Sequence, residues 1–538
     1  MGESRLASVT VTSDVAVLRR DGVTLRADVY RPAGGAGLPT LVMRLPYGKS
    51  RAQSYWYQPP SWYAERGFAV VVEDVRGRYA SEGEFTPLAT EVTDGADLVR
   101  WVADQPWSNG RIGSYGYSYC GLIQLLLAGS AEDVPLQAIA PAMAIPRLGE
   151  GGTSQSGVPA WGFVLGWAAE LGGLDLSRQE LRELRDVVQR PVAQLRAAVV
   201  PGREGWVGPW LEQDPADPYW TAGLDTVAYE GLSAAVLHIG GWFDVFRRAT
   251  VDHFAATVRA GTARSSQLVF GPWSHQPNLA AAVRPALAPD PQTWSVDDVQ
   301  LRFFRRELMD DDLADPPVAV AVLNSRESWT GHSWPPPDAE TVPFWLSSGG
   351  RANGREGDGE LHPRPPASSP PDHLVYDHRA PVPAVGGDDC GDPAVVGMGP
   401  ADQEQVERRR DVLVYTSAPV DGEELYLGSA AVELFVQTAA EHSQWLARLC
   451  LVTADGTSTN VAEAVSRLRA APGDVSTVRL DLGDVAVRVG PGDRVRLHVT
   501  NGSSPRWAGL LDDASAVCRS VVLHEPAGAS FLTLTRLR

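Results

Sequence analysis

Short hydrophobic runs alternate with amphipathic stretches over the first 145 residues of the chain. The runs TLVMRLPY and FAVVVEDVRG are apolar along almost their whole length and end at turn-forming residues. Such runs are typical of strands that are buried on both faces of a parallel sheet. In the stretch ATEVTDGADLVRWVADQ, Val92, Ala96 and Val99 recur at helical spacing. This alternation of strands with helices predicts an α/β sheet.

From about residue 146 to 235 the pattern becomes helical. Ser177, followed three residues later by Glu180, has the form of a capping box at a helix start. Leu181 and Val188 then fall on one apolar face of the same helix. Because no strand alternation interrupts this stretch, we predict a helical cap inserted over residues 146–235.

The α/β pattern returns at residue 236, so the α/β domain is predicted to comprise residues 1–145 and 236–347. Between 348 and 390 the chain is rich in Gly, Pro and Asp, which favours an irregular surface connection. Beyond it, stretches such as ELYLGSAAVELFVQTA and STVRLDLGDVAVRV have the pattern of successive strands. Many strands with almost no helical pattern predict an all-β sandwich, a jelly roll, over residues 348–538.

Composition narrows the class of protein. With 538 residues the chain is too long for one hydrophobic core, and its net charge of −19 argues against nucleic acid or an anionic membrane as a partner. The N-terminus lacks the pattern of a signal peptide, and no apolar run is long enough to span a membrane. The cysteines lack metal-type spacing and require no disulfide, so a cytoplasmic location is expected. They are Cys120, Cys390, Cys450 and Cys518.

The segment Gly116-Tyr117-Ser118-Tyr119-Cys120-Gly121 carries the most specific local signal. It follows a short strand, and an apolar helix begins directly after it. A nucleophile elbow has this layout, because its tight strand-to-helix turn needs small residues around a strained serine. The usual pattern places a second glycine two residues after the serine, where Cys120 stands here. The flanking strand and helix favour Ser118 as a nucleophile.

A serine nucleophile needs a histidine to take its proton and a carboxylate to orient that histidine. Of the three histidines before residue 330, His238 lies inside an apolar run and His253 lies in a helical stretch, so both are interpreted as structural. His275 follows a strand through the loop GPWS. Asp244 follows another strand in the loop GWFD. The order Ser118, Asp244, His275 is that of α/β-hydrolases.

Five segments occur in a fixed order along the chain: LPYGKS, DVRGRYASEGEF, GSYGYSYCG, GWFDVF and GPWSH. They resemble the cocaine esterase and X-prolyl dipeptidyl-peptidase family of serine hydrolases over essentially the whole chain. The resemblance implies an α/β-hydrolase core with a helical cap and a C-terminal jelly roll, and it implies the catalytic roles of Ser118, Asp244 and His275. It also implies that the Tyr47 hydroxyl and the Tyr119 backbone N–H stabilise the oxyanion. Without the resemblance, Tyr47 would be interpreted as an ordinary strand-end tyrosine.

These residues predict a serine carboxylesterase that works through an acyl-enzyme. Alternatives with the same triad are an amide or peptide acylase, an aminopeptidase of the X-prolyl dipeptidyl-peptidase type, and an acyltransferase in small-molecule biosynthesis. Pocket shape and water exclusion decide between them. An aminopeptidase needs acidic groups to hold the substrate amine. Because the sequence does not allow such groups to be placed in the cap, we prefer the carboxylesterase. A non-catalytic binding protein is the alternative from another class, and the complete set of catalytic residues argues against it.

No phosphate-binding glycine loop, dinucleotide fingerprint or H-E-x-x-H motif occurs, so neither a cofactor nor a metal is expected. The expected partner is a small-molecule ester or acyl substrate, without nucleic acid or membrane, and a homodimer is compatible with the sequence. Asp74 and Arg76 are interpreted as structural residues that hold a loop. Trp345 or the segment 504–507 is expected to form a jelly-roll wall beside the site.

Overall fold

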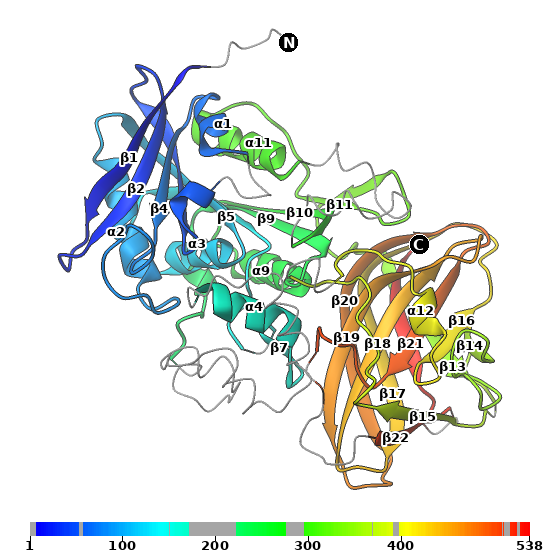
Figure 1. Cartoon of the computed structure of the whole chain (residues 1–538). Coiled ribbons are helices and arrows are strands. Elements are labelled where there is room, and N and C mark those ends of the chain that lie inside the picture. The colour runs from blue at the N-terminus through cyan, green and yellow to red at the C-terminus, as the bar shows by residue number, and fades with distance from the viewer. Residues whose placement is uncertain are drawn as a thin grey trace.

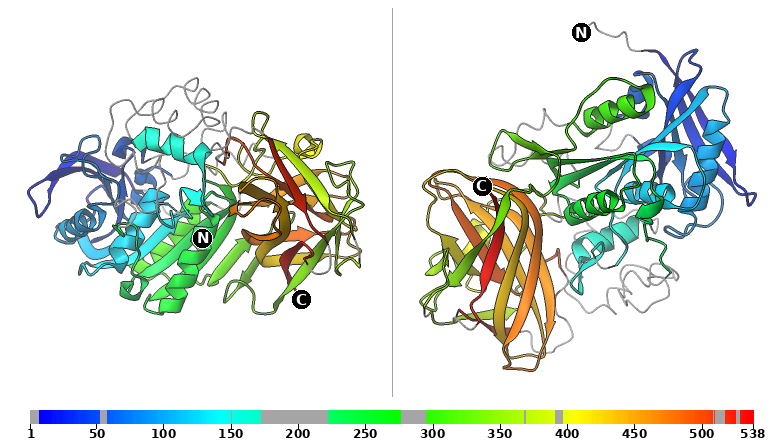
Figure 2. Two further views of the ribbon diagram at one scale, coloured as in Figure 1. Left: turned by 90° about the horizontal axis from the view of Figure 1, so that it is seen from below. Right: turned by 180° about the vertical axis from the view of Figure 1, so that it is seen from behind.

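The computed structural model describes residues 7–52, 58–149, 151–171, 222–275, 295–367, 369–390, 397–507, 509, 517–524 and 528–538. In these residues the chain forms two bodies that lie side by side, an α/β domain and a C-terminal β-sandwich (Figures 1 and 2). The helix predicted to start at Ser177 falls outside the described residues. The described part of the predicted cap includes α4 (Trp161–Leu171).

The α/β domain contains one mixed sheet whose central strands are parallel. From β4 to β11 all neighbouring strands run parallel, and the remaining pairs are antiparallel. Strands β4 and β9 are buried at every residue, as expected where helices cover both faces. The order is β1 (Val9–Leu18), β2 (Thr24–Pro32), β4 (Ala69–Asp74), β3 (Leu38–Leu45), β5 (Ser108–Tyr117), β6 (Leu136–Ala142), β9 (Ala235–Phe243), β10 (Ser265–Ser274), β11 (Val318–Ala321) and β12 (Ser328–Gly331).

Helices cover both faces of this sheet. On one face α2 (Glu91–Ala103) packs its apolar residues, Val99 among them, against Val42 and Val71 of the sheet. On the other face α11 (Val296–Met309) packs Phe304 into a second cluster with strand residues (Figure 1). The helical spacing recognised in the sequence is therefore the buried face of α2. The α/β class predicted from the sequence is confirmed.

The C-terminal body is built from an eleven-stranded, mostly antiparallel sheet that folds into a sandwich. Its core is continuous with that of the α/β domain, because Trp242 and Phe270 belong to the same hydrophobic cluster as Leu346 and Tyr426. The order is β15 (Asp372–Asp377), β22 (Val517–Val522), β17 (Glu424–Thr438), β23 (Phe531–Leu537), β13 (Ala339–Ser347), β14 (Gly359–His362), β16 (Leu413–Ser417), β21 (Arg494–Thr500), β18 (His442–Val452) and β19 (Ser458–Arg469), and β20 (Ser476–Val489) pairs with β17.

Two features of the sandwich differ from the sequence-based expectation. Strand β13 pairs with β23 and β14, so the C-terminal sheet begins before residue 348. Strands β14 and β15 also form inside the 348–390 segment, for which an irregular connection was expected. The prediction was wrong there because β15 gains its hydrogen bonds from β22, which lies far away in the sequence. Local composition carries no signal of such a pairing.

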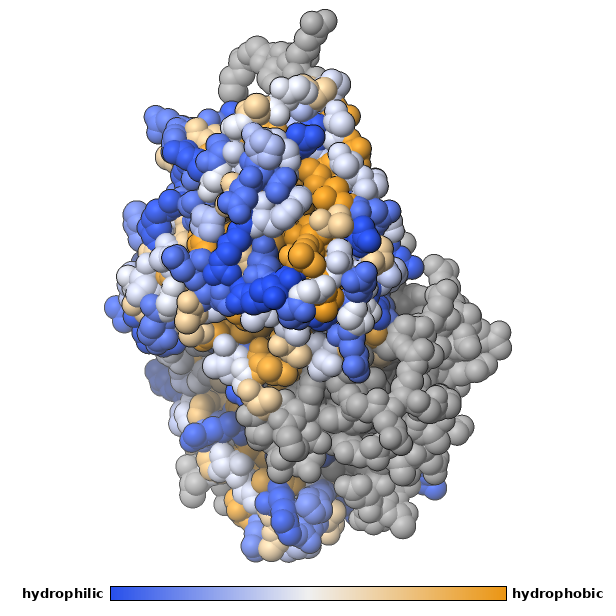
Figure 3. Space-filling model, turned by 90° about the vertical axis from the view of Figure 1, so that its left-hand side faces the viewer, coloured by the Kyte–Doolittle hydropathy of each residue, from blue (hydrophilic) through white to orange (hydrophobic). Residues whose placement is uncertain are grey.

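The outer face of the α/β domain is largely hydrophilic, with a band of hydrophobic side chains across it (Figure 3). Of the helices within the described ranges, none is both long and apolar enough to cross a membrane.

Candidate active site

The backbone turns sharply at Ser118, between β5 and α3 (Tyr119–Gly129). Ser118 has φ 59° and ψ −124°, a conformation that non-glycine residues rarely adopt. Its backbone N–H donates to the Ala142 carbonyl at 2.9 Å, and its own carbonyl accepts from the Leu122 N–H at 3.1 Å. The neighbouring strand and the helix therefore hold the strained turn that presents a nucleophile in this fold.

Both glycines of the elbow are required because neighbouring atoms lie too close to leave room for a side chain. A Cβ at Gly116 would lie 2.7 Å from the Cβ of Cys120, and one at Gly121 would lie 3.0 Å from the Cβ of Ala144. Cys120 itself is buried at the position where the usual pattern has glycine. It fits there because Gly116 leaves the space that its side chain occupies.

The three residues predicted to form the triad each follow directly after a strand of the central sheet. Ser118 follows β5, Asp244 follows β9 and His275 follows β10. Because these strands are parallel, their carboxyl ends lie at one edge of the sheet, where ligands bind in open α/β folds. The three residues, which are far apart in the sequence, therefore lie at the same edge of the sheet.

The structure joins the predicted acid to the predicted base. His275 Nδ1 and Asp244 Oδ1 are 2.6 Å apart, and both side chains are buried. The ring of Tyr117, the residue before Ser118, has its centroid 5.8 Å from that of His275. Within the described part of the chain, no hydrogen bond joins Ser118 Oγ to His275. Such contacts often tighten only when substrate binds.

Electrostatics favour protonation of the histidine. Burial lowers the pKa of His275, but Cys390 and Asp244 beside the ring raise it, and the net shift is upward. Burial raises the pKa of Asp244, and the charge of His275 opposes that shift. His275 is therefore a stronger base than an exposed histidine, which suits proton abstraction from a serine hydroxyl.

Tyr47, predicted to stabilise the oxyanion, lies just after β3. Its hydroxyl oxygen accepts a hydrogen bond of 2.9 Å from Trp167 Nε1 on α4. Burial raises the pKa of Tyr47 well above its usual value, so the hydroxyl keeps its proton. Tyr47 can therefore donate to a developing negative charge.

Side chains interpreted as structural hold the loop that carries Tyr47. The Lys49 backbone N–H donates to Asp74 Oδ1 at 2.6 Å, and Arg78 Nε donates to the Pro46 carbonyl at 2.8 Å. Arg76 forms an ion pair of 2.6 Å with Asp94 on α2. The segment after β4 therefore ties the Tyr47 loop to the sheet.

Tyr119 contributes to the elbow through its backbone and anchors it through its side chain. Its hydroxyl donates to Glu91 Oε1 at 2.7 Å and accepts from the Leu88 N–H at 2.9 Å. Tyr119 is the first residue of α3, so its N–H belongs to the group that points out of a helix start. This position is the one expected for the second oxyanion donor.

Aromatic side chains surround the base. The Phe163 and Trp167 rings of α4 stack at 5.1 Å, and the Phe246 ring lies edge-on to Phe163 at 5.5 Å and to His275 at 5.3 Å. Trp507 of the sandwich belongs to the same hydrophobic cluster. Phe163 and Phe246 were not singled out in the sequence. The position of Phe246, two residues after Asp244, was the available signal.

The wall expected from the sandwich forms from one of the two predicted segments. In the 504–507 segment the Arg506 carbonyl accepts a hydrogen bond of 3.2 Å from the Gly162 N–H on α4. Trp345 instead packs on Phe531 within the sandwich, at 4.9 Å between ring centroids. Of the two alternatives the structure favours the 504–507 segment, because Trp345 lies on β13, inside the sandwich sheet.

Cys390 is the residue near the base that sequence reasoning missed. Its side chain packs against the hydrophobic cluster that contains Phe246, whose ring lies 5.3 Å from that of His275. No local motif distinguishes Cys390, which lies in a glycine- and aspartate-rich stretch of the sandwich domain. Only the folding of that domain against α9 (Arg247–Ala260) brings it to the site.

The other two candidate histidines are structural. His238 is buried within β9, and its Nε2 has no hydrogen-bond partner among the described residues. His253 is buried on α9, where Nδ1 lies 2.5 Å from the Tyr229 hydroxyl and Nε2 lies 3.1 Å from the Ile145 carbonyl. Neither belongs to the edge of the sheet at which Ser118 lies.

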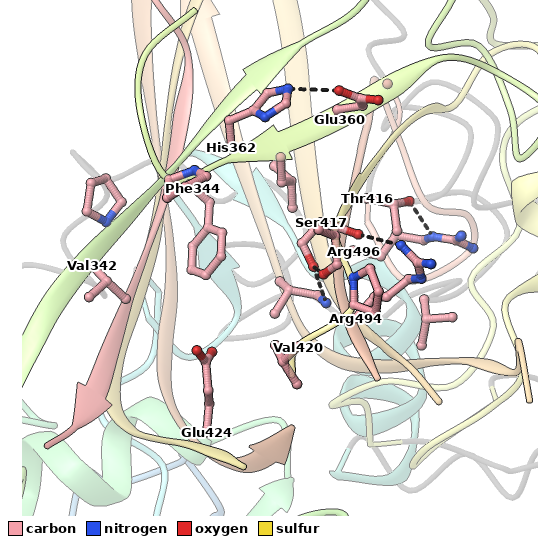
Figure 4. A pocket seen from close by; sticks show the side chains of 18 of the residues that line it. Val342, Phe344, Glu360, His362, Thr416, Ser417, Val420, Glu424, Arg494 and Arg496 are labelled. Atoms are coloured by element: carbon pink, nitrogen blue, oxygen red, sulfur yellow. Dashed lines mark hydrogen bonds and ion pairs between the residues drawn. The ribbon is translucent and has the colours of Figure 1, made fainter. Parts of the chain in front are cut away.

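A groove of about 930 Å³ lies in the sandwich (Figure 4). Phe344, Glu424 and Arg494 are among its lining residues, and no residue of the predicted triad is. The groove is therefore separate from the candidate active site. In the described ranges, no cluster of three or more histidine, cysteine or acidic side chains has the arrangement of a metal site.

A strained serine at a strand-to-helix turn, an acid–histidine pair after two later strands and a helix-covered parallel sheet define a serine hydrolase of the α/β-hydrolase fold. Residues 21–277 match the model of the X-Pro dipeptidyl-peptidase (S15) family, and residues 313–509 match its C-terminal non-catalytic domain. Cocaine esterase from Rhodococcus sp. (strain MB1 Bresler) is 31% identical over 542 residues, which cover 93% of this chain and 92% of that protein. The chain belongs to this S15 family of serine hydrolases.

Solved structures share the complete architecture. An aminopeptidase from a marine sediment Thaumarchaeota archaeon superposes with a TM-score of 0.83 at 19% identity, covering 100% of this chain and 98% of that one. An α-amino acid ester hydrolase superposes with a TM-score of 0.82 at 21% identity, covering 98% of this chain and 96% of that one. At these identities the likeness shows the fold alone. Proteins named for ester and for peptide chemistry thus share one fold.

Proposed function

We propose that the protein is a carboxylesterase in which Ser118 is the nucleophile, His275 the general base and Asp244 the acid that orients the base. The observation that carries the proposal is the 2.6 Å contact between His275 and Asp244, at the edge where the strained Ser118 follows β5. The expected partner is a small-molecule ester or related acyl substrate. Its relative, cocaine esterase, bears the name of an ester-cleaving enzyme.

The first half of the reaction acylates the serine. Ser118 Oγ attacks the substrate carbonyl carbon while His275 Nε2 accepts the hydroxyl proton, and Asp244 stabilises the imidazolium that forms. The Tyr47 hydroxyl and the Tyr119 backbone N–H donate to the negative oxygen of the tetrahedral intermediate. The imidazolium then protonates the leaving alcohol, and the ester C–O bond breaks.

The second half releases the acyl group. Water attacks the acyl-enzyme carbonyl and gives a proton to His275, and the oxyanion is held by the same two donors. Collapse of this intermediate returns the proton to Ser118 Oγ and frees the carboxylic acid. The aromatic side chains around His275 limit the access of bulk water, which strengthens the electrostatic interactions within the site.

The acidic groups beside the site favour an ester over a substrate with a free α-amine. Burial raises the pKa of Glu170, on α4, and the charges of Arg51 and Arg78 only partly oppose that shift. Asp388, near Asp244, forms an ion pair of 2.5 Å with Arg506. Asp388 is therefore compensated by an arginine within the protein, and burial disfavours the charged form of Glu170. The residues after Asp244, Val245 and Phe246, are apolar.

An aminopeptidase or acylase remains the second candidate, because the family model is that of X-Pro dipeptidyl-peptidases. Matched substrates separate the two: an ester and an amide with the same acyl group, each with and without a free α-amine. Preference for the ester regardless of the amine supports the carboxylesterase. Preference for amine-bearing substrates, lost in Glu170→Gln, supports the aminopeptidase.

The primary test is turnover of a panel of aryl and alkyl esters by the wild type and by Ser118→Ala. We expect the variant to lose about 10⁴-fold or more in kcat. Ser130→Ala, at the opposite end of α3, is the matched control and should retain wild-type turnover, because its hydroxyl only caps the helix end. Equal activity of Ser118→Ala and the wild type would contradict the assignment of the nucleophile.

A further inference from the structure

The only lysine of the chain lies two residues after Tyr47. Of the 47 lysine and arginine residues, Lys49 alone is a lysine. Its side chain is 11% exposed, and its ammonium faces a carboxylate on each of three neighbouring segments. Lysine suits this position because a compact ammonium can face several carboxylates at once, whereas a guanidinium directs its donors in a fixed planar fork.

Three aspartates share the Lys49 ammonium. Its Nζ lies 2.7 Å from Asp14 Oδ1, 3.5 Å from Asp74 Oδ2 and 3.8 Å from Asp28 Oδ1. The Asp14 backbone N–H also donates to Asp28 Oδ1 at 2.9 Å, at a bulge in β1 where Asp14 has φ 55°. Arg26, a second cation nearby, donates to the backbone carbonyl of Asp14 at 3.2 Å. In the described part of the chain, Lys49 is the only residue that forms ion pairs with these three aspartates.

Asp74 holds Lys49 through both its backbone and its side chain. The Lys49 backbone N–H donates to Asp74 Oδ1 at 2.6 Å, and the ammonium lies beside Asp74 Oδ2. Asp74 Oδ2 also accepts the Ala80 N–H at 3.3 Å. Gly48, the one residue between Tyr47 and Lys49, has φ 95°, so the chain turns sharply there. A displacement of Lys49 is therefore passed to Tyr47 across a single residue.

Removal of the ammonium would leave three carboxylates facing one another without the cation they share. Asp74 is 1% exposed, and burial already raises its pKa, a shift that Lys49 opposes. Without Lys49, repulsion between the carboxylates and burial favour a protonated or displaced Asp74. Such an Asp74 holds the Lys49 backbone N–H less firmly, and the Tyr47 loop loses its fixed position.

We propose that Lys49 is a positioning residue for Tyr47: its ammonium gathers the three carboxylates and thereby holds the Tyr47 hydroxyl where the oxyanion forms. This inference rests on the proposed function, in which Tyr47 donates to the oxyanion. The ammonium is held on the β1 and β2 side of the loop, whereas the Tyr47 hydroxyl meets Trp167 on α4. Lys49 therefore acts on the rate through Tyr47.

The first test compares kcat and KM for one ester in the wild type, Lys49→Met and Lys49→Arg, with kcat expressed per titrated active site. Lys49→Met should lower kcat at least about tenfold, because a misplaced group loses its transition-state contact. The loss should not exceed the roughly 10²–10³-fold expected when the oxyanion donor itself is removed. KM should change by less than about twofold, because the contact is absent from the ground state. Lys49→Arg keeps the charge and should lie between the two.

Arg20→Met is the matched control. Arg20, in the turn after β1, pairs with Asp97 of α2 at 2.6 Å and with Glu132 after α3 at 2.8 Å, so the variant also takes a cation from two carboxylates. It should keep the wild-type kcat. If Lys49 only stabilises the fold, Lys49→Met lowers the melting temperature and leaves kcat per titrated site unchanged. That result would overturn the inference.

The second test is a double-mutant cycle between Lys49 and Tyr47. Once the hydroxyl is absent its position no longer matters, so Lys49→Met should lower kcat by less than about twofold in the Tyr47→Phe background. Equal losses in the two backgrounds would show that the residues act independently and would reject the inference.

Asp14→Asn covers the case in which Lys49→Met does not fold. The Asp14 side chain is 64% exposed, so folding should tolerate the change, and the substitution removes the charge closest to the ammonium. It should give a smaller loss of kcat that again disappears in the Tyr47→Phe background. Unchanged kcat in both Asp14→Asn and Lys49→Arg contradicts the inference.

Failure of the proposed function gives a different result: no ester is turned over, or Ser118→Ala is as active as the wild type. Turnover that depends on Ser118 and Tyr47 but is indifferent to Lys49 rejects the inference alone.

Discussion

The two domains bury polar groups in different ways. In the sandwich, Asp372 accepts hydrogen bonds of 2.8 Å from Ser348, Tyr415 and His524, so its charge is compensated on several sides. At the edge of the α/β sheet, Ser118 is held in a strained backbone conformation and Asp244 pairs with His275. The sandwich uses buried polar groups to fix its loops. At the edge of the α/β sheet, the buried Asp244–His275 pair is placed where it can exchange a proton.

The largest expected effect is on kcat, and it should differ between two buried aspartates, one in each domain. Asp244→Asn should lower kcat by about 10⁴-fold, because the amide stabilises the wrong tautomer of His275 and cannot stabilise the imidazolium. Asp372→Asn should leave kcat near that of the wild type and lower the melting temperature. Steady-state kinetics and thermal unfolding measure the two effects. A fully active Asp244→Asn variant would remove the distinction between the domains.

The next effect concerns the ion pairs of the sandwich. Arg506 pairs with Asp388 and Glu463, and all three side chains are buried. Arg506→Met removes one of the two arginines that contact each carboxylate, leaving Arg247 near Asp388 and Arg448 on Glu463, and should lower the free energy of unfolding by about 3 kcal/mol. Arg479→Met, which breaks an exposed pair with Glu433, should cost about 1 kcal/mol or less. Urea unfolding of both variants measures the difference, and equal losses would contradict it.

A smaller effect is expected from the oxyanion tyrosine. Tyr47→Phe removes one donor and should lower kcat by about 10²–10³-fold with little change in KM, because the contact forms only in the transition state. Tyr415→Phe, which removes a buried hydroxyl in the sandwich, is the matched control and should affect stability instead. A loss confined to KM in Tyr47→Phe would assign that tyrosine to substrate binding.

The smallest effect is a displacement of the pH profile. The base must be neutral to accept a proton, so kcat/KM should fall as pH drops through the pKa of His275. Because that pKa is raised from 6.5, half-maximal activity should lie on the alkaline side of pH 6.5. Activity that stays constant into the acidic range would exclude His275 as the base. The pH–rate profile with a neutral ester measures this.

Prediction from sequence was most specific where the pattern is local. An elbow needs its serine, its glycines and the flanking strand and helix within a dozen residues, so GSYGYSYCG indicated Ser118, and the structure has the strained turn at that residue. Asp244 and His275 followed because each comes directly after an apolar strand run. The positions of these three residues are properties of short segments, and the parallel sheet brings segments of that kind to one edge.

Other features could not be predicted from the amino-acid pattern, because they depend on contacts between segments that are far apart in the chain. Cys390 and Trp507 join the hydrophobic cluster that contains Phe246 only through the packing of the sandwich against the α/β domain. Strand β15 exists because β22 pairs with it. The chain alone thus predicts the strand-to-helix turn at Ser118, the order of the proposed triad and the two classes of sheet. Tertiary packing decides what surrounds His275, since the hydrophobic cluster beside it takes side chains from both domains.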